Sequence, residues 1–184
     1  MLCLFFFSYI QTMHSKGEMN NYKHPLAASG SCGSNLKFSI SSETLTIKGS
    51  GDMNNYGYTS GNINTPWFDY HNSTKTVVIE SGATSIGDCA FYYFEVLTSI
   101  SIPNTVTSIG YQSFRQCDIL QSIELPSSLT SISRWAFNLC VSLLSITLPE
   151  KIVLIPDSML YLCRSLLSVT FLGQVTTIEN HALS

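Results

Sequence analysis

The chain has 184 residues, a length typical of one domain or of one domain with an extension. Only 11% of its residues are charged, against about 25% in an average soluble domain, and its formal net charge is −3. Its nine lysines and arginines are spread thinly and form no basic patch, so nucleic acid is excluded as the expected partner.

Residues 1–29 are predicted to be a leader. The first ten residues, MLCLFFFSYI, resemble the apolar core of a secretory signal and are too short to span a bilayer. No basic segment precedes them, and a candidate cleavage site follows only at Ala27, Ala28 and Ser29. Two interpretations stay open: a working signal sequence, or an arbitrary gene start or fragment end. Residues 11–28 are typical of a linker with little order, and no transmembrane span is expected in the chain.

Residues 30–76 are predicted to form an N-terminal β-hairpin cap. Apolar and polar residues alternate in 36–40 and again in 45–47, which is the pattern of two half-buried strands. A long loop rich in glycine and asparagine then leads to Trp67, the largest apolar side chain of this region. Because a solenoid needs an atypical end to cover its first apolar layer, this segment is the expected cap.

Residues 77–184 are predicted to be repeats with a period of 23 residues. The anchor isoleucine of the repeat recurs in equal steps at Ile86, Ile109, Ile132, Ile155 and Ile178. One such unit cannot bury its apolar side alone, so the units are expected to stack as a solenoid. The last unit stops at Ser184 and would leave an apolar layer open. Either the natural protein continues, or this C-terminal edge associates with a second chain.

Each repeat is expected to contain two short strands and a helical turn. An apolar-x-apolar strand such as Ile123 to Leu125 is ended by a proline, and a second extended piece follows. The position after the anchor isoleucine holds glycine, serine, Pro156 or Glu179, and proline suits the first turn of a helix. The fold class is therefore a mainly β solenoid of α/β type with short helical turns.

The cysteines favour buried thiols over disulfides. Cys117, Cys140 and Cys163 share one column of the repeat, and Phe94 occupies that column in the first unit. A column that accepts phenylalanine is apolar and inward, where a free thiol behaves as a small hydrophobe. Cys89 lies off this column in a variable one, so it is predicted to be exposed, as a passive surface residue rather than a reactive thiol.

The repeat columns resemble those of the BspA-like leucine-rich repeat family, in Leu120, Ile123, Leu125, Pro126, Leu129, Thr130, Ile132, Ala136, Phe137 and Cys140. Residues 31–36, 49–53 and 65–67 are similar to the cap of that family. The resemblance covers residues 30–184 and departs from the pattern at Phe94, Pro156 and Leu172. It implies a leucine-rich repeat solenoid, and a surface or secreted protein of bacteria or parasitic protists that binds host matrix or cells.

The residues indicate no catalytic or cofactor chemistry. None of the four histidines stands at metal-ligand spacing from cysteine or a carboxylate, and no glycine-rich phosphate loop is present. No repeat column supplies a base beside Cys89, so a nucleophilic enzyme is not expected. We predict a protein without cofactor or metal that is not an enzyme.

The candidate partner-binding residues are the outward positions of the strand before each proline, joined by two tyrosines of the cap loop: Ser99, Ser101, Ser122, Glu124, Ser145, Thr147, Ser168, Thr170, Tyr56 and Tyr58. The alternative for the serine column is a solvated ladder of hydroxyls selected for β propensity. The strands would offer only a few hundred Å², against about 800 Å² per partner in a standard interface, so the cap loop or the flanks would have to contribute.

The resulting hypothesis is a non-catalytic protein-interaction or adhesion module at the cell surface or in the secreted fraction. The expected partner is a host-matrix or cell-surface protein. Two alternatives stay open: a structural spacer in a longer surface protein, and a scaffold segment in the cytoplasm.

Overall fold

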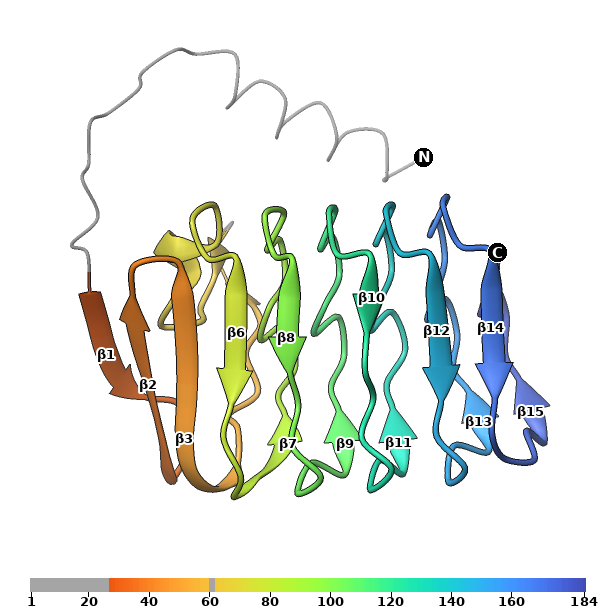
Figure 1. Ribbon diagram of the computed structural model, residues 1–184, viewed down its shortest axis with the longest axis horizontal. Coiled ribbons are helices and arrows are strands. Elements are labelled where there is room, and N and C mark those ends of the chain that lie inside the picture. Colours follow the sequence, from red (N-terminus) through yellow and green to blue (C-terminus); the bar gives the residue numbers. More distant parts are fainter. Residues whose placement is uncertain (1–26, 60–61) are drawn as a thin grey trace, which may run out of the picture.

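The structure, a computed structural model, describes residues 27–59 and 62–184 and shows a flattened solenoid of stacked coils (Figure 1). Residues 1–26 lie outside the described part, and with them the predicted signal core, most of the linker and Cys3. The 23-residue period is the actual offset between neighbouring coils, since Ser122 pairs with Ser145 and Ser145 with Ser168. The predicted leucine-rich repeat solenoid is confirmed.

The cap contains the predicted β-hairpin, formed by β2 (Asn35–Ser41) and β3 (Thr44–Asp52). A further strand, β1 (Ala27–Ser31), pairs antiparallel with β2 at the outer edge. Strand β3 is long enough to start both layers of the solenoid, because its first half pairs in parallel with β6 (Thr76–Ile79) and its end pairs with β7 (Ala83–Ile86). The cap is therefore hydrogen-bonded into the repeats.

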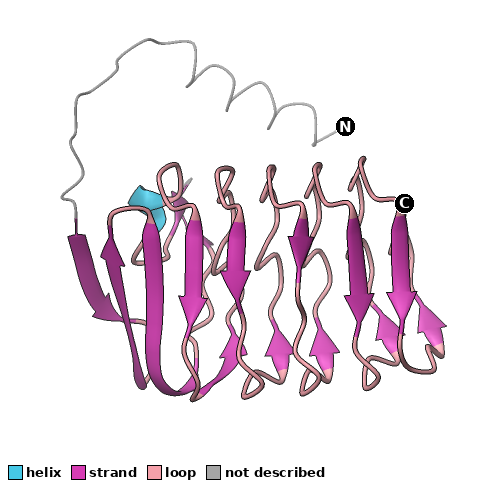
Figure 2. Ribbon diagram, in the orientation of Figure 1, coloured by secondary structure: helices cyan, strands magenta, loops and turns pink. Residues whose placement is uncertain are grey.

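The coils form two layers of parallel strands, which Figure 2 shows as two rows of arrows that point in opposite directions. One layer contains β6 (Thr76–Ile79), β8 (Ser99–Ser101), β10 (Ser122–Ile123), β12 (Ser145–Leu148) and β14 (Ser168–Phe171). The other layer contains β7 (Ala83–Ile86), β9 (Ser108–Ile109), β11 (Ser131–Ile132), β13 (Leu154–Ile155) and β15 (Thr177–Ile178). A small hairpin of β4 (Tyr58–Thr59) and β5 (Asn62–Ile63) and a 3-10 turn, η1 (Phe68–Tyr70), complete the cap region.

The predicted helical turn of each repeat is wrong. Residues 87–97 and their equivalents form tandem turns, in which residues such as Gln112 and Gln116 have left-handed φ angles of 53° and 61°. Their backbone N–H groups bond to the neighbouring coil, as Phe91 N does to Ser113 O at 2.8 Å and Phe114 N to Ala136 O at 2.8 Å. A helix would keep these donors within its own coil. Hydrogen bonding between coils therefore selects the turns.

An aromatic spine forms the centre of the core. The rings of Trp67, Phe91, Phe114 and Phe137 stack in order, with centroid separations of 6.0, 5.3 and 5.3 Å. Trp67 is fully buried and its Nε1 donates to the carbonyl of Ala90 at 2.7 Å. The cap tryptophan thus takes the place that a phenylalanine of a preceding coil would occupy.

The buried cysteine column is confirmed. Cys117, Cys140 and Cys163 are free thiols, and each S–H donates to the carbonyl of a spine phenylalanine in the previous coil, at 3.4, 3.1 and 3.1 Å. Burial raises the pKa of the Cys140 and Cys163 thiols well above the ordinary value. These thiols act as small core side chains with a weak donor.

The predicted exposure of Cys89 is wrong, because its side chain is only 2% exposed. It packs with Ile63 of β5 and with Tyr92 in a small second core. Burial raises the pKa of its thiol to about 11, with a further contribution from Asp88 that exceeds the lowering by Arg115. The repeat pattern gives no sign of this burial, since β5 belongs to the cap.

Candidate interaction surfaces

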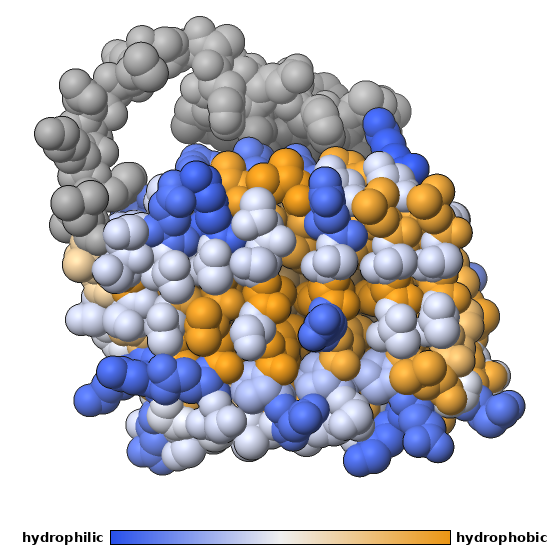
Figure 3. All heavy atoms as spheres, viewed as in Figure 1, coloured by the Kyte–Doolittle hydropathy of each residue, from blue (hydrophilic) through white to orange (hydrophobic). Residues whose placement is uncertain are grey.

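The strand face is the outward side of β6, β8, β10, β12 and β14. The eight candidate residues that lie on or beside these strands are all exposed: Ser99, Ser101, Ser122, Glu124, Ser145, Thr147, Ser168 and Thr170. The parallel register aligns Ser122, Ser145 and Ser168 in one row and pairs Thr147 with Thr170 in a second. Figure 3 shows this face, on which pale rows of hydroxyl residues alternate with hydrophobic ones.

Glu124 is the one ionisable side chain among these eight residues, and it is exposed. The hydroxyls near the cap bond to the preceding coil, since Ser99 Oγ donates to Thr76 Oγ1 at 3.3 Å. The small side chains in both rows project little from the strands, so the backbone of a partner could come close to them over most of the face.

Two exposed leucines border the strand face and were not among the predicted residues. Leu144 is 42% and Leu167 84% exposed, and the bond from Leu167 N to Leu144 O at 2.9 Å places them side by side. They follow Thr98 and Gln121 in one repeat column, so a change from polar to apolar residues along that column is the signal that could have identified them. The strand face therefore has an apolar rim near its C-terminal end.

The cap tyrosines occupy different positions from the strand residues. The Tyr56 side chain is half-buried, its ring meets Trp67 edge-on at 5.5 Å, and its hydroxyl donates to Cys32 O at 3.5 Å. Burial raises the pKa of Tyr56 above its ordinary value. Tyr58 lies in β4, and its side chain is outside the described part of the chain. Tyr56 thus packs over the cap core and is separate from the strand face.

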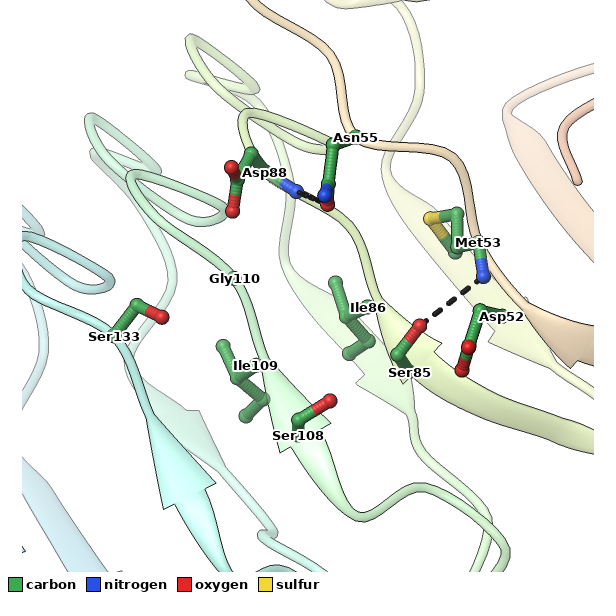
Figure 4. Close-up of a pocket in the computed structure, with 10 residues that line it drawn as sticks. All are labelled: Asp52, Met53, Asn55, Ser85, Ile86, Asp88, Ser108, Ile109, Gly110 and Ser133. Carbon is green, nitrogen blue, oxygen red and sulfur yellow. Dashed lines mark hydrogen bonds between the residues drawn. The ribbon is translucent and has the colours of Figure 1, made fainter.

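A shallow groove of about 280 Å³ lies where the cap meets β7 and β9 (Figure 4). Its two carboxylates already accept hydrogen bonds, Asp52 from Thr84 Oγ1 at 2.6 Å and Asp88 from Tyr111 N at 2.7 Å. Asn55 accepts a bond from Asp88 N at 3.0 Å. The polar groups of this groove thus connect the cap to the first coils.

Within residues 27–59 and 62–184, no group of three or more histidine, cysteine, aspartate or glutamate side chains is arranged to hold a metal ion. Among the same residues, no helix has the length and apolar character that crossing a membrane requires.

The comparisons with known proteins agree with this geometry. The model of the BspA type leucine rich repeat region matches residues 61–184 in six copies. A leucine-rich repeat protein from Eubacterium ventriosum is 24% identical, with a TM-score of 0.68 over 84% of this chain and 40% of its own. A leucine rich cell surface protein from Faecalibacterium prausnitzii is 28% identical, with a TM-score of 0.61 over 87% of this chain and 46% of its own.

A leucine-rich repeat protein from T. pallidum is 19% identical, with a TM-score of 0.54 over 74% of this chain and 78% of its own, and shows the same fold. The chain spans less than half the length of the two proteins from Eubacterium ventriosum and Faecalibacterium prausnitzii. No curated protein matches it. None of these similarities indicates a catalytic family.

Proposed function

We propose, on the premise that this chain belongs to the BspA-type leucine-rich repeat family, that it is an adhesion module on the cell surface or in the secreted fraction. The family is one of protein-interaction repeats, and the partner that we propose is a host-matrix or cell-surface protein. The Faecalibacterium prausnitzii protein, described as a cell surface protein, supports the location. The observation that carries the proposal is the exposure of Glu124, Leu144 and Leu167, which interrupt the uniform rows of the strand face.

The proposed contact combines Glu124 with Leu144 and Leu167. Glu124 directly follows β10, the middle one of the five strands of the strand face, and supplies charge, which favours one orientation of the partner. The two leucines supply exposed apolar area, which burial in an interface would remove from water. The serine and threonine rows allow close approach of the partner backbone.

The size of the strand face limits the affinity. The strands step by about 4.8 Å and extend for about 10 Å, so they cover only a few hundred Å², against about 800 Å² per partner in a standard interface. A stable contact therefore needs the leucine rim or the cap loop as well. The uniform rows of hydroxyl residues favour the alternative, a spacer segment, in which the strand face binds nothing.

Binding to immobilised extracellular matrix proteins tests the proposal. Glu124→Gln and Leu167→Ser are expected to weaken capture, whereas the matched controls Glu80→Gln and Val153→Ser, exposed positions outside this contact, are expected to leave it unchanged. Protease added to intact source cells would also digest a surface protein. Protection of the chain together with a cytosolic control would contradict the proposed location and favour an intracellular scaffold.

A further inference from the structure

The turn face is the outward side of residues 87–97, 110–120, 133–143 and 156–166, between the two strand layers. Its columns change from coil to coil, whereas the core columns of the same coils repeat. One column reads Asp88, Tyr111, Arg134 and Asp157, all at least partly exposed, and another reads Tyr92, Arg115, Asn138 and Tyr161, of which Arg115 and Tyr161 reach the surface. Asp88 and Asn138 hydrogen-bond to the next coil, at Tyr111 N and Tyr161 O, but stacking of the coils does not by itself require the arginines. Their choice therefore points to a role other than folding.

Four of these residues, Tyr92, Tyr111, Arg115 and Arg134, form with Trp135 an aromatic–arginine cluster across three successive coils, in which Tyr92 is buried and the other four reach the surface. The guanidinium carbon of Arg115 lies 5.0 Å from the ring centroid of Trp135 and 5.5 Å from that of Tyr92, so rings of the coils before and after it flank the cation. The guanidinium of Arg134 lies 5.3 Å from the Tyr111 ring. The Tyr111 and Trp135 rings are 6.2 Å apart and join the two pairs.

Trp135 is an unusual residue for its backbone position. Its φ of 62° is left-handed, a conformation that disfavours bulky side chains. The equivalent positions hold Gln112 and Ser158, so the turn itself does not need an indole. The indole Nε1 donates to Asp157 Oδ2 at 3.3 Å, which holds the ring in place beside Arg115.

The two arginines of the cluster have no ion-pair partner within the described residues, where the one salt bridge joins Lys75 and Glu43. The buried Nε of Arg115 has no hydrogen-bond acceptor either. The aromatic rings therefore hold both guanidinium groups without neutralising them. The terminal nitrogens of the half-buried Arg115 and the guanidinium of the exposed Arg134 thus keep N–H donors for an acceptor outside the chain.

We propose that the aromatic–arginine cluster is a second docking surface, which binds a protein segment bearing carboxylate side chains. Carboxylates match the paired donors of a guanidinium, and tyrosine, tryptophan and arginine are the residue types that dominate binding energy at interfaces. A guanidinium already covers one face of the Tyr92, Tyr111 and Trp135 rings, which leaves less ring surface for stacking a sugar. The proposal does not use the strand face and is independent of the function proposed above.

Fluorescence anisotropy with a short labelled peptide of alternating glutamate and phenylalanine tests this surface at neutral pH. The wild-type chain is expected to bind this peptide more tightly than one in which glutamine replaces glutamate. Arg115→Met and Arg134→Met are each expected to weaken binding about tenfold, and Arg115→Lys nearly as much, because lysine lacks the planar fork. Unfolding curves of the variants would verify that the fold is intact.

Arg164→Met is the matched control, since it removes the same charge from the remaining arginine of the chain, which is exposed and outside the cluster. An equal loss in Arg164→Met would mean general charge attraction and would overturn the proposal, as would failure of the wild-type chain to prefer the glutamate peptide. Binding of a heparin oligosaccharide through the two cluster arginines, without binding of the peptide, would overturn the choice of a protein partner. Glu124→Gln is expected to leave peptide binding unchanged, which separates this surface from the strand face.

Discussion

Replacement of Phe114 tests whether the aromatic spine is the main source of stability. Its ring is fully buried between those of Phe91 and Phe137, with centroids 5.3 Å away on either side. Phe114→Ala removes both stacked contacts and leaves a cavity, which is expected to cost about 4 kcal/mol of unfolding free energy. Stabilities of whole domains are about 5–15 kcal/mol, so this variant would lose a large share or fail to fold.

Phe114→Leu keeps the prediction measurable, because leucine already fills this column at Leu160. We expect a loss of about 1–2 kcal/mol in urea unfolding followed by circular dichroism, without a change in the slope. Leu160→Ala is expected to cost about 2–3 kcal/mol, less than Phe114→Ala, since its outer neighbour Leu183 is exposed. The control Ser127→Ala should stay within about 0.5 kcal/mol. If Phe114→Leu had the same unfolding midpoint as this control, the stacked rings of the spine would not be a source of stability.

Three other predictions follow from buried groups. In a Cys3→Ser variant, the native protein is expected to react slowly with a thiol reagent at neutral pH, and the denatured protein quickly. The reason is that burial raises the pKa of Cys89 to about 11 and raises that of Cys163 further. Fast labelling of Cys89 in the native protein would contradict its burial. Trp67→Phe is expected to cost about 2 kcal/mol in thermal unfolding, since it leaves the Ala90 carbonyl without its donor; an unchanged melting temperature would argue against that bond. Burial, with a smaller contribution from Glu95, raises the pKa of Asp118 to about 6, so ionisation destabilises the folded state as pH rises from about 4 to about 6. Asp118→Asn should therefore stabilise the fold at neutral pH by about 1 kcal/mol. The full pKa shift corresponds to about 3 kcal/mol, which is reduced here because the carboxyl is partly exposed. Equal stabilisation at about pH 3, where the carboxyl is protonated, would refute ionisation as the cause.

The periodic part of the fold could be predicted because each core column has one structural environment. Ile109 and Ile132 pair directly in neighbouring strands, and Cys117 and Cys140 repeat the same hydrogen bond. A position that is ambiguous in one coil can be assigned from the equivalent positions of the other coils, because all residues of a core column share the same environment. Trp67 was predictable for a related reason: the first apolar layer needs a cover, and no other side chain of the cap is as large.

The turns and Cys89 could not be predicted from the period. Proline at position 156 suits a helix and a turn equally, and only the bonds between coils, such as Phe137 N to Met159 O at 3.0 Å, distinguish the two. Cys89 is buried by Ile63, a residue of the cap that has no counterpart in later coils. Where one coil meets a non-repeating element, a position in that coil has an environment that its equivalents lack. Its burial therefore cannot be inferred from the residues at the equivalent positions of the other coils.

The strand face and the turn face differ in how far folding alone explains their residues. On the strand face, the serine row would be kept by strand propensity alone, so exposure of Ser122 or Ser145 is weak support for binding. Glu124, Leu144 and Leu167 break the uniformity of that face, and strand propensity accounts for none of them. On the turn face, nearly every outward residue differs from its neighbours, and the differences produce a connected cluster in which Arg115 lies between Trp135 and Tyr92. In a solenoid, an outward residue that differs from the other residues of its column, and that does not improve the core, is therefore best explained by binding to a partner.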